Sequence, residues 1–262
     1  MQNIKSLGLA LALTAGLAFC NGTEAAATDS DPEMEAHLDL LSTQEAIWKN
    51  YMHIDEAIAQ YGEFAITDLD NNGRPEILFT TTAGAEECIE NWGYEVNEAG
   101  DGVSLLQFLN GSNAVDINQS PIRMYFACQI NERYYIFETV RWVPSMEGGW
   151  AREANLSSLR LSQGQVRQES LGGFFEAHES RELPPFSTTY RDQNHKIISA
   201  KAYANLAKSH YVYHHPNHVT IGWTSVAELA RAMDSREKVR ALFAKSWAGF
   251  HAEEIDEGPV HG

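Results

Sequence analysis

The sequence predicts an α+β fold, with an N-terminal helix and C-terminal helices packed on a central antiparallel β-meander. Three observations predict this class. Apolar residues recur at helical spacing near both ends of the chain, short apolar runs occupy its middle, and turn-forming residues separate those runs at hairpin distances. Because successive hairpins follow one another without intervening helices, an antiparallel meander is favoured over a βαβ array.

The first 27 residues have the features of a bacterial-type secretory signal peptide. Lys5 supplies a positive charge, and the apolar run 7–19 suits a signal core but is too short to span a bilayer. Alanines at −3 and −1 then permit cleavage before Thr28. We therefore expect an exported protein, periplasmic or secreted, with a signal peptide at 1–27 and one domain at 28–262.

Cys20 leaves a second mode of export open. Residues 17–20 resemble a lipoprotein box, in which the cysteine is acylated and becomes the new N-terminus. Phe19 departs from that box, because a small residue normally precedes the cysteine. No later stretch has as many as ~18 consecutive apolar residues, so we expect no transmembrane helix in the mature chain.

The charge of the chain is strongly acidic, with a formal net charge of −17 and a pI near 4.9. A surface of this sign repels a phosphate backbone, and the sequence has no basic patch. We therefore expect no nucleic-acid partner. An acidic excess is compatible with solubility and with cation binding.

Cys88 and Cys128 are the two cysteines that remain after removal of the signal peptide. In an oxidising compartment such a pair is first interpreted as a disulfide bond. The alternative is one buried thiol and one exposed thiol.

The N-terminal helical region is predicted to begin at Asp31-Pro32, because proline is favoured at the first helical position. A capping-box pattern follows at residues 42–45. Apolar residues then recur at helical spacing until Gly62 ends the run; they are Ile47, Tyr51, Ile54 and Ile58.

Four pairs of short strands are predicted after this region. The first pair, 64–66 and 77–79, flanks an acidic loop. The other three are predicted hairpins, 92–96 with 103–108, 123–129 with 133–143, and 154–161 with 166–171.

The C-terminal third begins with the polar segment 174–194, which contains two prolines and predicts a long surface loop. Helical patterning returns at 199–209 and 225–248. The acidic tail from Glu253 is expected to fray.

The acidic loop between the first two strands is the most informative stretch. With Asp68 as position 1, side-chain oxygens fall at positions 1, 3, 5 and 9, a glycine occupies position 6, and a backbone carbonyl is available at position 7. Calcium takes roughly six to eight oxygen ligands, and this spacing lets a tight loop supply them. We predict a calcium site whose ligands are Asp68, Asp70, Asn72, the Arg74 carbonyl and Glu76.

The loop has two other possible interpretations. It is not an EF-hand, because Phe79 stands at position 12, where a bidentate glutamate belongs, and strands flank the loop. The remaining alternative is a plain hairpin, in which Asn72-Gly73 makes the turn and the acidic side chains are merely solvated.

The segment from Phe64 to Phe79 resembles the strand–loop–strand calcium motif of FG-GAP and VCBS repeats. It is still more similar to exported bacterial proteins of unknown function that carry one DxDxDG-type loop followed by Pro-Glu-Leu. The resemblance implies a calcium site, and Asn72 in place of the commoner Asp would weaken it. Since we find one copy, a propeller is not implied. The matching residues are Asp68, Asp70, Asn72, Gly73, Pro75 and Glu76.

The sequence contains two further candidate binding sites. The segment His210–His218 holds four histidines, which either bind a transition metal or form a solvated, pH-sensitive stretch. Trp150 follows Gly148-Gly149 and is a candidate contact residue for a glycan or a peptide, whereas aromatic residues alternating along strands are more often core.

The sequence contains no nucleophile elbow, no phosphate loop and no Ser-x-x-Lys followed by suitable partner motifs, which favours a non-catalytic protein. Catalytic groups need not be neighbours in sequence. The alternative is therefore a periplasmic or surface hydrolase with an active site dispersed over loops such as 144–151 and 172–195.

Overall fold

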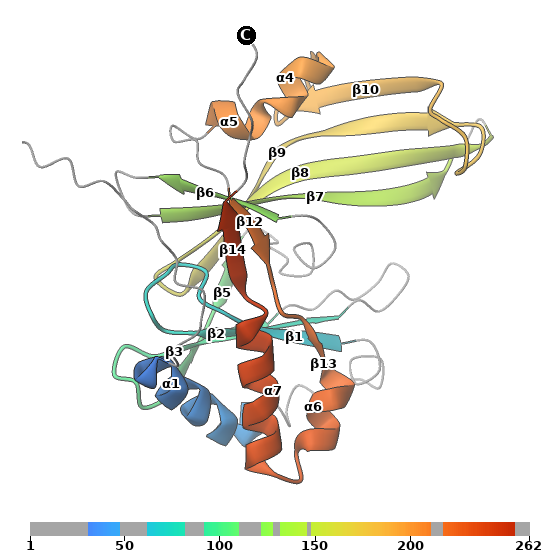
Figure 1. The fold of residues 1–262 in the computed structure, drawn as a ribbon. Coiled ribbons are helices and arrows are strands. Elements are labelled where there is room, and N and C mark those ends of the chain that lie inside the picture. The colour runs from blue at the N-terminus through green and yellow to red at the C-terminus, as the bar shows by residue number, and fades with distance from the viewer. Residues whose placement is uncertain are drawn as a thin grey trace, which may run out of the picture.

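The protein is described by a computed structural model, and its fold is α+β, with antiparallel sheets and a few helices (Figure 1). The expected signal peptide, Cys20, Cys88 and Cys128 lie outside the residues that it describes, as does most of the predicted helix after Ile47. The described residues are 31–47, 62–81, 92–109, 122–127, 132–145, 148–210 and 217–254.

The smaller sheet has five strands in the order β13-β1-β2-β3-β4, and all its pairings are antiparallel. Its centre is the pair β1 (Gly62–Thr67) and β2 (Glu76–Thr81), which the acidic loop connects. The neighbouring strand is β3 (Trp92–Val96), and short strands form the two edges, β13 (Thr224–Ser225) and β4 (Val103–Leu105).

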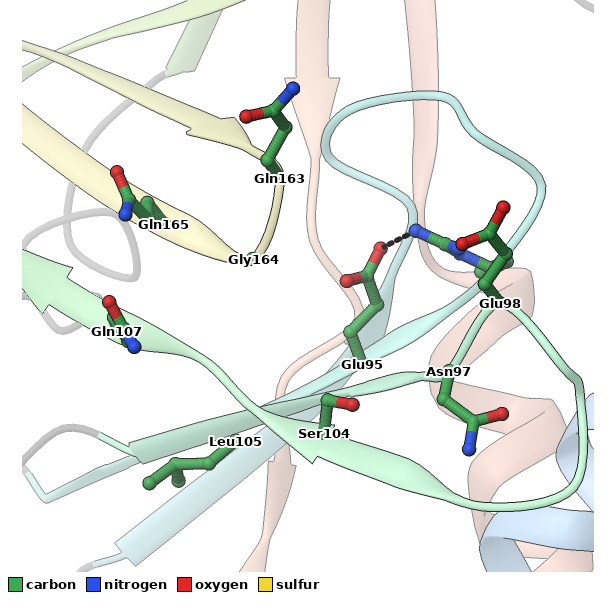
Figure 2. Close-up of a pocket in the computed structure, with 10 residues that line it drawn as sticks. Glu95, Asn97, Glu98, Ser104, Leu105, Gln107, Gln163, Gly164 and Gln165 are labelled. Atoms are coloured by element: carbon green, nitrogen blue, oxygen red, sulfur yellow. Dashed lines mark hydrogen bonds and ion pairs between the residues drawn. The ribbon is translucent and has the colours of Figure 1, made fainter.

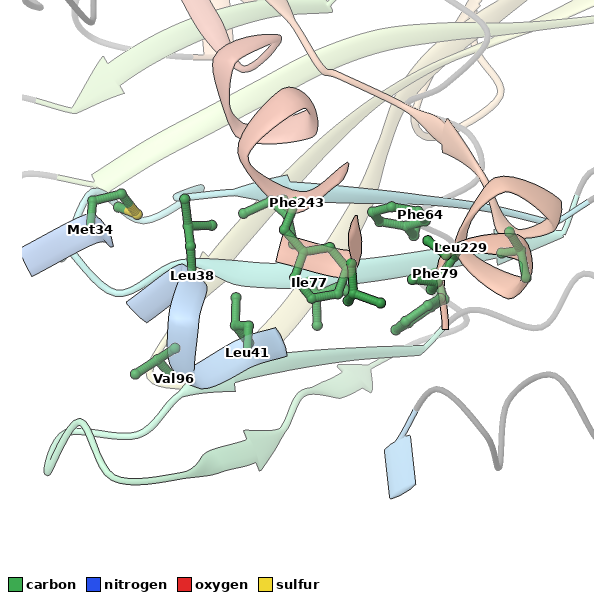
Figure 3. Packing of buried hydrophobic residues seen from close by; sticks show 13 residues of the cluster. Met34, Leu38, Leu41, Phe64, Ile77, Phe79, Val96, Leu229 and Phe243 are labelled. Carbon is green, nitrogen blue, oxygen red and sulfur yellow. The ribbon is translucent and has the colours of Figure 1, made fainter. Parts of the chain in front are cut away.

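Three helices share a core with this sheet: α1 (Pro32–Thr43), α6 (Val226–Ala232) and α7 (Arg236–Ala248) (Figure 3). The rings of Phe64 and Phe243 meet edge to face, with centroids 5.5 Å apart. This core fixes the orientation of β1 and β2, and therefore the place at which the acidic loop leaves the sheet.

The larger sheet has nine strands. Eight follow the order β11-β10-β9-β8-β7-β6-β12-β14, and β5 pairs with β9 in parallel. The strands are β5 (Gln107–Leu109), β6 (Ile122–Ala127), β7 (Glu132–Pro144), β8 (Trp150–Ser162), β9 (Gln165–His178), β10 (Ser187–Asp192), β11 (Ile197–Ile198), β12 (Asn217–Thr220) and β14 (His251–Glu254).

Strands β7 to β10 form the part of the larger sheet that projects away from the smaller one (Figure 1). The short helices α4 (Ala200–Ala204) and α5 (Leu206–His210) lie beside this projecting part, against β10 and β9. Tyr203 of α4 donates a hydrogen bond to Glu138 at 2.8 Å, and its ring meets that of Phe174 edge to face. None of the helices in the described ranges is long and apolar enough to cross a membrane.

A second core joins the two sheets. Leu69 of the acidic loop and Leu78 of β2 pack in one cluster with residues of the larger sheet, including Tyr135 and Phe137. Because Leu69 is 1% exposed, the acidic loop begins at the junction between the two sheets.

Several details differ from the sequence-based expectations. The predicted strand 103–108 is divided at Leu106, because β4 pairs within the smaller sheet and β5 with β9 of the larger one. The predicted surface loop 174–194 is mostly strand, since β9 extends to His178 and β10 pairs with it. The residues of the expected capping box begin inside α1, which ends at Thr43.

The C-terminal helical runs are each divided in two. Helix α6 ends at Ala232, and Ser235 then caps α7 by accepting a hydrogen bond from the Lys238 amide, so 225–248 is not one helix. Residues 199–209 form α4 and α5. Glu253, where fraying was expected, pairs with His218 in the β14–β12 ladder.

Candidate metal centre

The acidic loop folds around the carboxylate of Asp68. One carboxylate oxygen accepts a hydrogen bond from the Asn72 amide at 3.0 Å, and the other accepts one from the Gly73 amide at 3.1 Å. Asn71 and Gly73 have φ values of 56° and 80°, a region that glycine and asparagine adopt most readily. The chain therefore reverses over a carboxylate that is 7% exposed.

Glu76 begins β2, opposite Thr67 at the end of β1, and its side chain is fully buried. Its Oε2 accepts hydrogen bonds from the Thr67 hydroxyl at 2.9 Å and the Leu69 amide at 2.8 Å. Its Oε1 is buried and has no hydrogen-bond partner among the described residues. Burial, followed by the charges of Asp68 and Asp70, raises the pKa of Glu76 well above its ordinary value.

Asp70 is half-buried and faces the same cluster. Its Oδ1 is also buried without a hydrogen-bond partner in the described part of the chain. Burial first, and then the charges of Glu95 and Asp68, raise the pKa of Asp70 to about 6 from an ordinary 3.8. The pKa of Asp68 is raised by burial too, although its backbone hydrogen bonds oppose the increase.

Three of the five predicted ligands converge. Carboxylate oxygens of Asp68, Asp70 and Glu76, one from each, all lie within 4.8 Å of one another. A group of hard oxygen donors at this separation can hold a cation such as calcium or magnesium. It lacks the nitrogen and sulfur donors that zinc and copper sites usually contain.

The other two predicted ligands surround the cluster differently. The Asn72 amide nitrogen donates to Glu95 at 2.6 Å, while its Oδ1 accepts from the Arg74 backbone amide at 2.7 Å. The Arg74 guanidinium also pairs with Glu95, at 2.9 Å. The Asn72 side chain thus braces the loop, and the ligand roles of Asn72 and the Arg74 carbonyl stay predictions.

Glu95 is a part of the site that the sequence interpretation missed. It lies in β3 directly opposite Glu76 and is 5% exposed. Like charges opposite each other on neighbouring strands repel. Hydrogen bonds from Arg74 and Asn72 to Glu95, and from the Leu69 amide of the loop to Glu76, offset this repulsion. The available sequence signal was a glutamate within a short apolar strand.

Two residues of β7 connect the site to the larger sheet. The buried Tyr135 hydroxyl donates a 2.6 Å hydrogen bond to the Leu69 carbonyl. Arg133, 7% exposed, lowers the pKa of Asp68 by its charge, against the effect of burial. The loop is consequently held from both sheets.

The remaining candidate residues are placed as follows. The Arg181 guanidinium lies 3.6 Å from the centre of the Trp150 ring and covers part of it. His210 ends α5 and His218 lies in β12, while His214 and His215 fall outside the described residues.

The two segments expected to carry a dispersed hydrolase site, 144–151 and 172–195, are partly strand. Residues 172–178 belong to β9 and 187–192 to β10. Glu176 pairs with Arg152 at 3.0 Å, and His178 places one ring nitrogen 3.4 Å from Glu176 and the other 2.8 Å from the Leu183 carbonyl. These contacts join β8 to β9 and fix the end of β9 to the turn that follows it.

Fold and site together define an α+β protein with an acidic loop at the junction of two sheets, in which Asp68 and Glu76 are buried and Asp70 is half-buried. Comparison of the chain with protein-family models, curated proteins and solved structures gives no match. The similarity of the loop to FG-GAP and VCBS motifs therefore remains an interpretation of some 20 residues.

Proposed function

We propose that this chain is an exported protein that binds one calcium ion in the β1–β2 loop, and that the ion has a structural role. Asp68, Asp70 and Glu76 would supply the carboxylates, with Asn72 and the Arg74 carbonyl as the further predicted ligands. Export rests on the sequence of residues 1–27. The observation that carries the calcium proposal is the pair of buried carboxylate oxygens, Asp70 Oδ1 and Glu76 Oε1, without described partners.

The charge balance supports a divalent ion. When fully ionised, the four carboxylates and two guanidinium groups of the site leave two negative charges, which one divalent cation would neutralise. Without a cation, burial and mutual repulsion favour protonation instead, as the raised pKa values of Asp70 and Glu76 indicate. The groups counted are Asp68, Asp70, Glu76, Glu95, Arg74 and Arg133.

The chemistry of the donors favours calcium among divalent ions. Calcium accepts irregular sets of carboxylate and carbonyl oxygens, whereas magnesium requires near-ideal octahedral geometry and keeps several waters. The carboxylates of Asp68, Asp70 and Glu76 come from different positions along the loop and β2 and form an irregular set of ligands. Such a set suits calcium better than magnesium. We expect a weak affinity, with Kd on the order of 10⁻⁴–10⁻³ M as in extracellular modules.

A structural role follows from the position of the loop. Leu69 packs between the sheets, and Tyr135 of the larger sheet donates to its carbonyl. An ion held by residues on either side of Leu69 would therefore stabilise the junction. A ligand that binds only the folded state stabilises it by roughly 1.4 kcal/mol when its free concentration is about ten times Kd.

The test is a calorimetric calcium titration, combined with thermal unfolding in calcium and in chelator, on the mature protein. We compare Asp70→Asn with Asp234→Asn, because both remove one negative charge and Asp234 is an exposed residue outside the site. The wild type and Asp234→Asn should bind calcium and melt at a higher temperature in it, and Asp70→Asn should lose both effects.

Comparing the two variants distinguishes calcium binding in the loop from nonspecific attraction of calcium by the acidic surface. Identical melting curves for the wild type in calcium and in chelator would contradict the proposal. So would an equal loss of calcium response in the two variants, because the response would then depend on net charge and not on the loop.

A further inference from the structure

A polar hollow of about 320 Å³ lies beside the acidic loop, where the chain crosses from the smaller sheet to the larger one (Figure 2). One wall is the β3–β4 hairpin, which contributes Glu95 and Ser104. The other is formed by β5 and the turn between β8 and β9, with Gln107, Gln163 and Gln165. Arg74 of the acidic loop completes the lining.

Backbone hydrogen bonds build the second wall and also attach it to the first, because the Leu106 amide, just before β5, donates to the Gly93 carbonyl of β3 at 2.8 Å. Gln107 pairs with Gln165 in the parallel β5–β9 ladder, and the Gln107 amide donates to the Gly164 carbonyl at 2.8 Å. Leu106, which connects β4 to β5, is 3% exposed and anchors the crossing in the core between the sheets. The hollow is therefore set by the fold and not by flexible side chains alone.

We propose that this polar hollow binds a neutral, polyhydroxylated ligand, such as a mono- or disaccharide. Amide and hydroxyl side chains, here Gln107, Gln163, Gln165 and Ser104, both donate and accept hydrogen bonds. Adjacent hydroxyl groups of a sugar do the same, so each can be matched. The side chain of Leu105, which is 61% exposed at the rim, offers an apolar surface to the C–H face of a sugar ring.

The same lining disfavours other ligand classes. An anion would meet the carboxylates of Glu95 and Glu98 and the single guanidinium of Arg74, which is already paired with Glu95. A cationic ligand would find Glu95 engaged by Arg74 and Asn72, which leaves the exposed Glu98. A largely apolar ligand would find little surface besides Leu105 and would leave the amides unmatched.

The experiment uses saturation-transfer-difference NMR on the mature protein in calcium-containing buffer. The probes are D-glucose, D-galactose and N-acetyl-D-glucosamine at millimolar concentration, with spermidine as a cationic probe and methyl phosphate, whose methyl protons the method can observe, as an anionic one. We expect saturation transfer to at least one sugar and none to the charged probes. Titration of the responding sugar then gives its Kd.

The variant is Gln107→Leu, which keeps the backbone bond to Gly164 but removes the side-chain amide. Gln193→Leu is the matched control, because Gln193 is an exposed residue of the β10–β11 turn, away from the hollow. Gln107→Leu should weaken sugar binding about 5- to 10-fold, the effect of one lost hydrogen bond, whereas Gln193→Leu should bind like the wild type. Ser104→Ala provides a second test if Gln107→Leu fails to fold.

Three results would overturn the proposal: no response to any of the sugars, equal affinity of the wild type and both hollow variants, or a response to spermidine or methyl phosphate in place of sugars. A calcium titration of the same sample separates this inference from the calcium proposal. Calcium binding without a sugar response overturns the sugar site alone, and a sugar response without calcium binding overturns the calcium site alone.

Discussion

The two carboxylate oxygens of Glu76 have different surroundings. Oε2 accepts two hydrogen bonds, from Thr67 and Leu69, whereas Oε1 is buried with no partner among the described residues. An unsatisfied buried acceptor costs about 1–3 kcal/mol, and more when it is charged. A buried carboxylate oxygen without a hydrogen-bond partner is a local conflict of the kind expected at functional or strained sites.

Replacing Glu76 with glutamine should affect stability in opposite directions with and without calcium. The amide oxygen can keep the hydrogen bonds from Thr67 and Leu69, and loss of the charge relieves repulsion from Asp68 and Asp70. In chelator near neutral pH, we therefore expect Glu76→Gln to be at least as stable as the wild type. In calcium it should lose the stabilisation of roughly 1.4 kcal/mol expected at about ten times Kd.

Chemical unfolding of both proteins in the two buffers measures this reversal. Glu179→Gln, at an exposed position just after β9, is the matched control and should respond to calcium like the wild type. A Glu76→Gln protein that keeps the full calcium response, or that is much less stable than the wild type in chelator, would contradict the prediction.

The local part of the site was predictable because its residues are neighbours in sequence. The alternation of Asp68, Asp70 and Asn72 with a turn glycine identified the loop, and the structure brings Asp68 and Asp70 together with Glu76. Glu95 could not be predicted, because its place depends on the register between β2 and β3. That register is set by the packing of whole strands and not by any local pattern.

At the scale of the elements, Ser246 joins α7 to the smaller sheet. Strand β13 pairs with β1 at Glu63 and Phe64 and ends there. Beyond that end, the Ile66 amide donates to the Ser246 hydroxyl at 2.9 Å, and this hydroxyl donates to the Gly222 carbonyl at 2.6 Å. One buried side chain thus serves two backbone groups that the short edge strand leaves unpaired.

Ser246→Ala should destabilise the protein by about 1–3 kcal/mol, because it leaves the Ile66 amide and the Gly222 carbonyl without this partner. Alanine has the higher helix propensity, so a loss of stability cannot arise from the helix itself. The control is Ala241→Ser, which exchanges the same two residue types at an exposed position of α7 and should cost less than about 0.5 kcal/mol. Urea unfolding of the wild type and both variants measures these changes. Equal unfolding free energies for Ser246→Ala and Ala241→Ser would contradict the prediction.

The strands were predictable as elements but not in their assignment to sheets. The hairpins β3–β4, β6–β7 and β8–β9 follow from alternating patterns around turn residues. The division of residues 103–109 between two sheets does not, because it depends on the burial of Leu106 between them. The polar segment that became β10 was missed because its exposed faces lack an apolar pattern, although its backbone pairs with β9.

At the scale of the whole molecule, the acidic loop is where the two sheets meet. Helices α1, α6 and α7 share one core with the smaller sheet. Leu69 belongs to the second core, which lies between the smaller and the larger sheet. The Tyr135 hydrogen bond to Leu69 and the buried Arg133 hold the loop from the second sheet. Protonation or ion binding in the loop should therefore change the stability of the whole molecule.

The direction of this pH dependence follows from the raised pKa values. Without metal, the pKa of Asp70 is about 6 in the folded protein against an ordinary 3.8, and that of Glu76 is raised well above its ordinary 4.5. A group whose pKa is higher in the folded state binds its proton more tightly when folded. Its contribution to stability is complete below its unfolded pKa, near 4, and is lost as pH rises through about 6.

The difference in unfolding free energy between the wild type and Asp70→Asn isolates this effect from the other carboxylates. In chelator, the two proteins should be nearly equal in stability at about pH 4, and the wild type should become progressively the less stable one up to about pH 7. Calcium must displace the same protons, so wild-type calcium affinity should increase over this pH range, with proton release detectable by calorimetry in buffers of different ionisation enthalpy. A stability difference that does not change with pH, or calcium binding without proton release near pH 6, would show that Asp70 is ionised in the metal-free protein and that the loop is solvated rather than closed around its carboxylates.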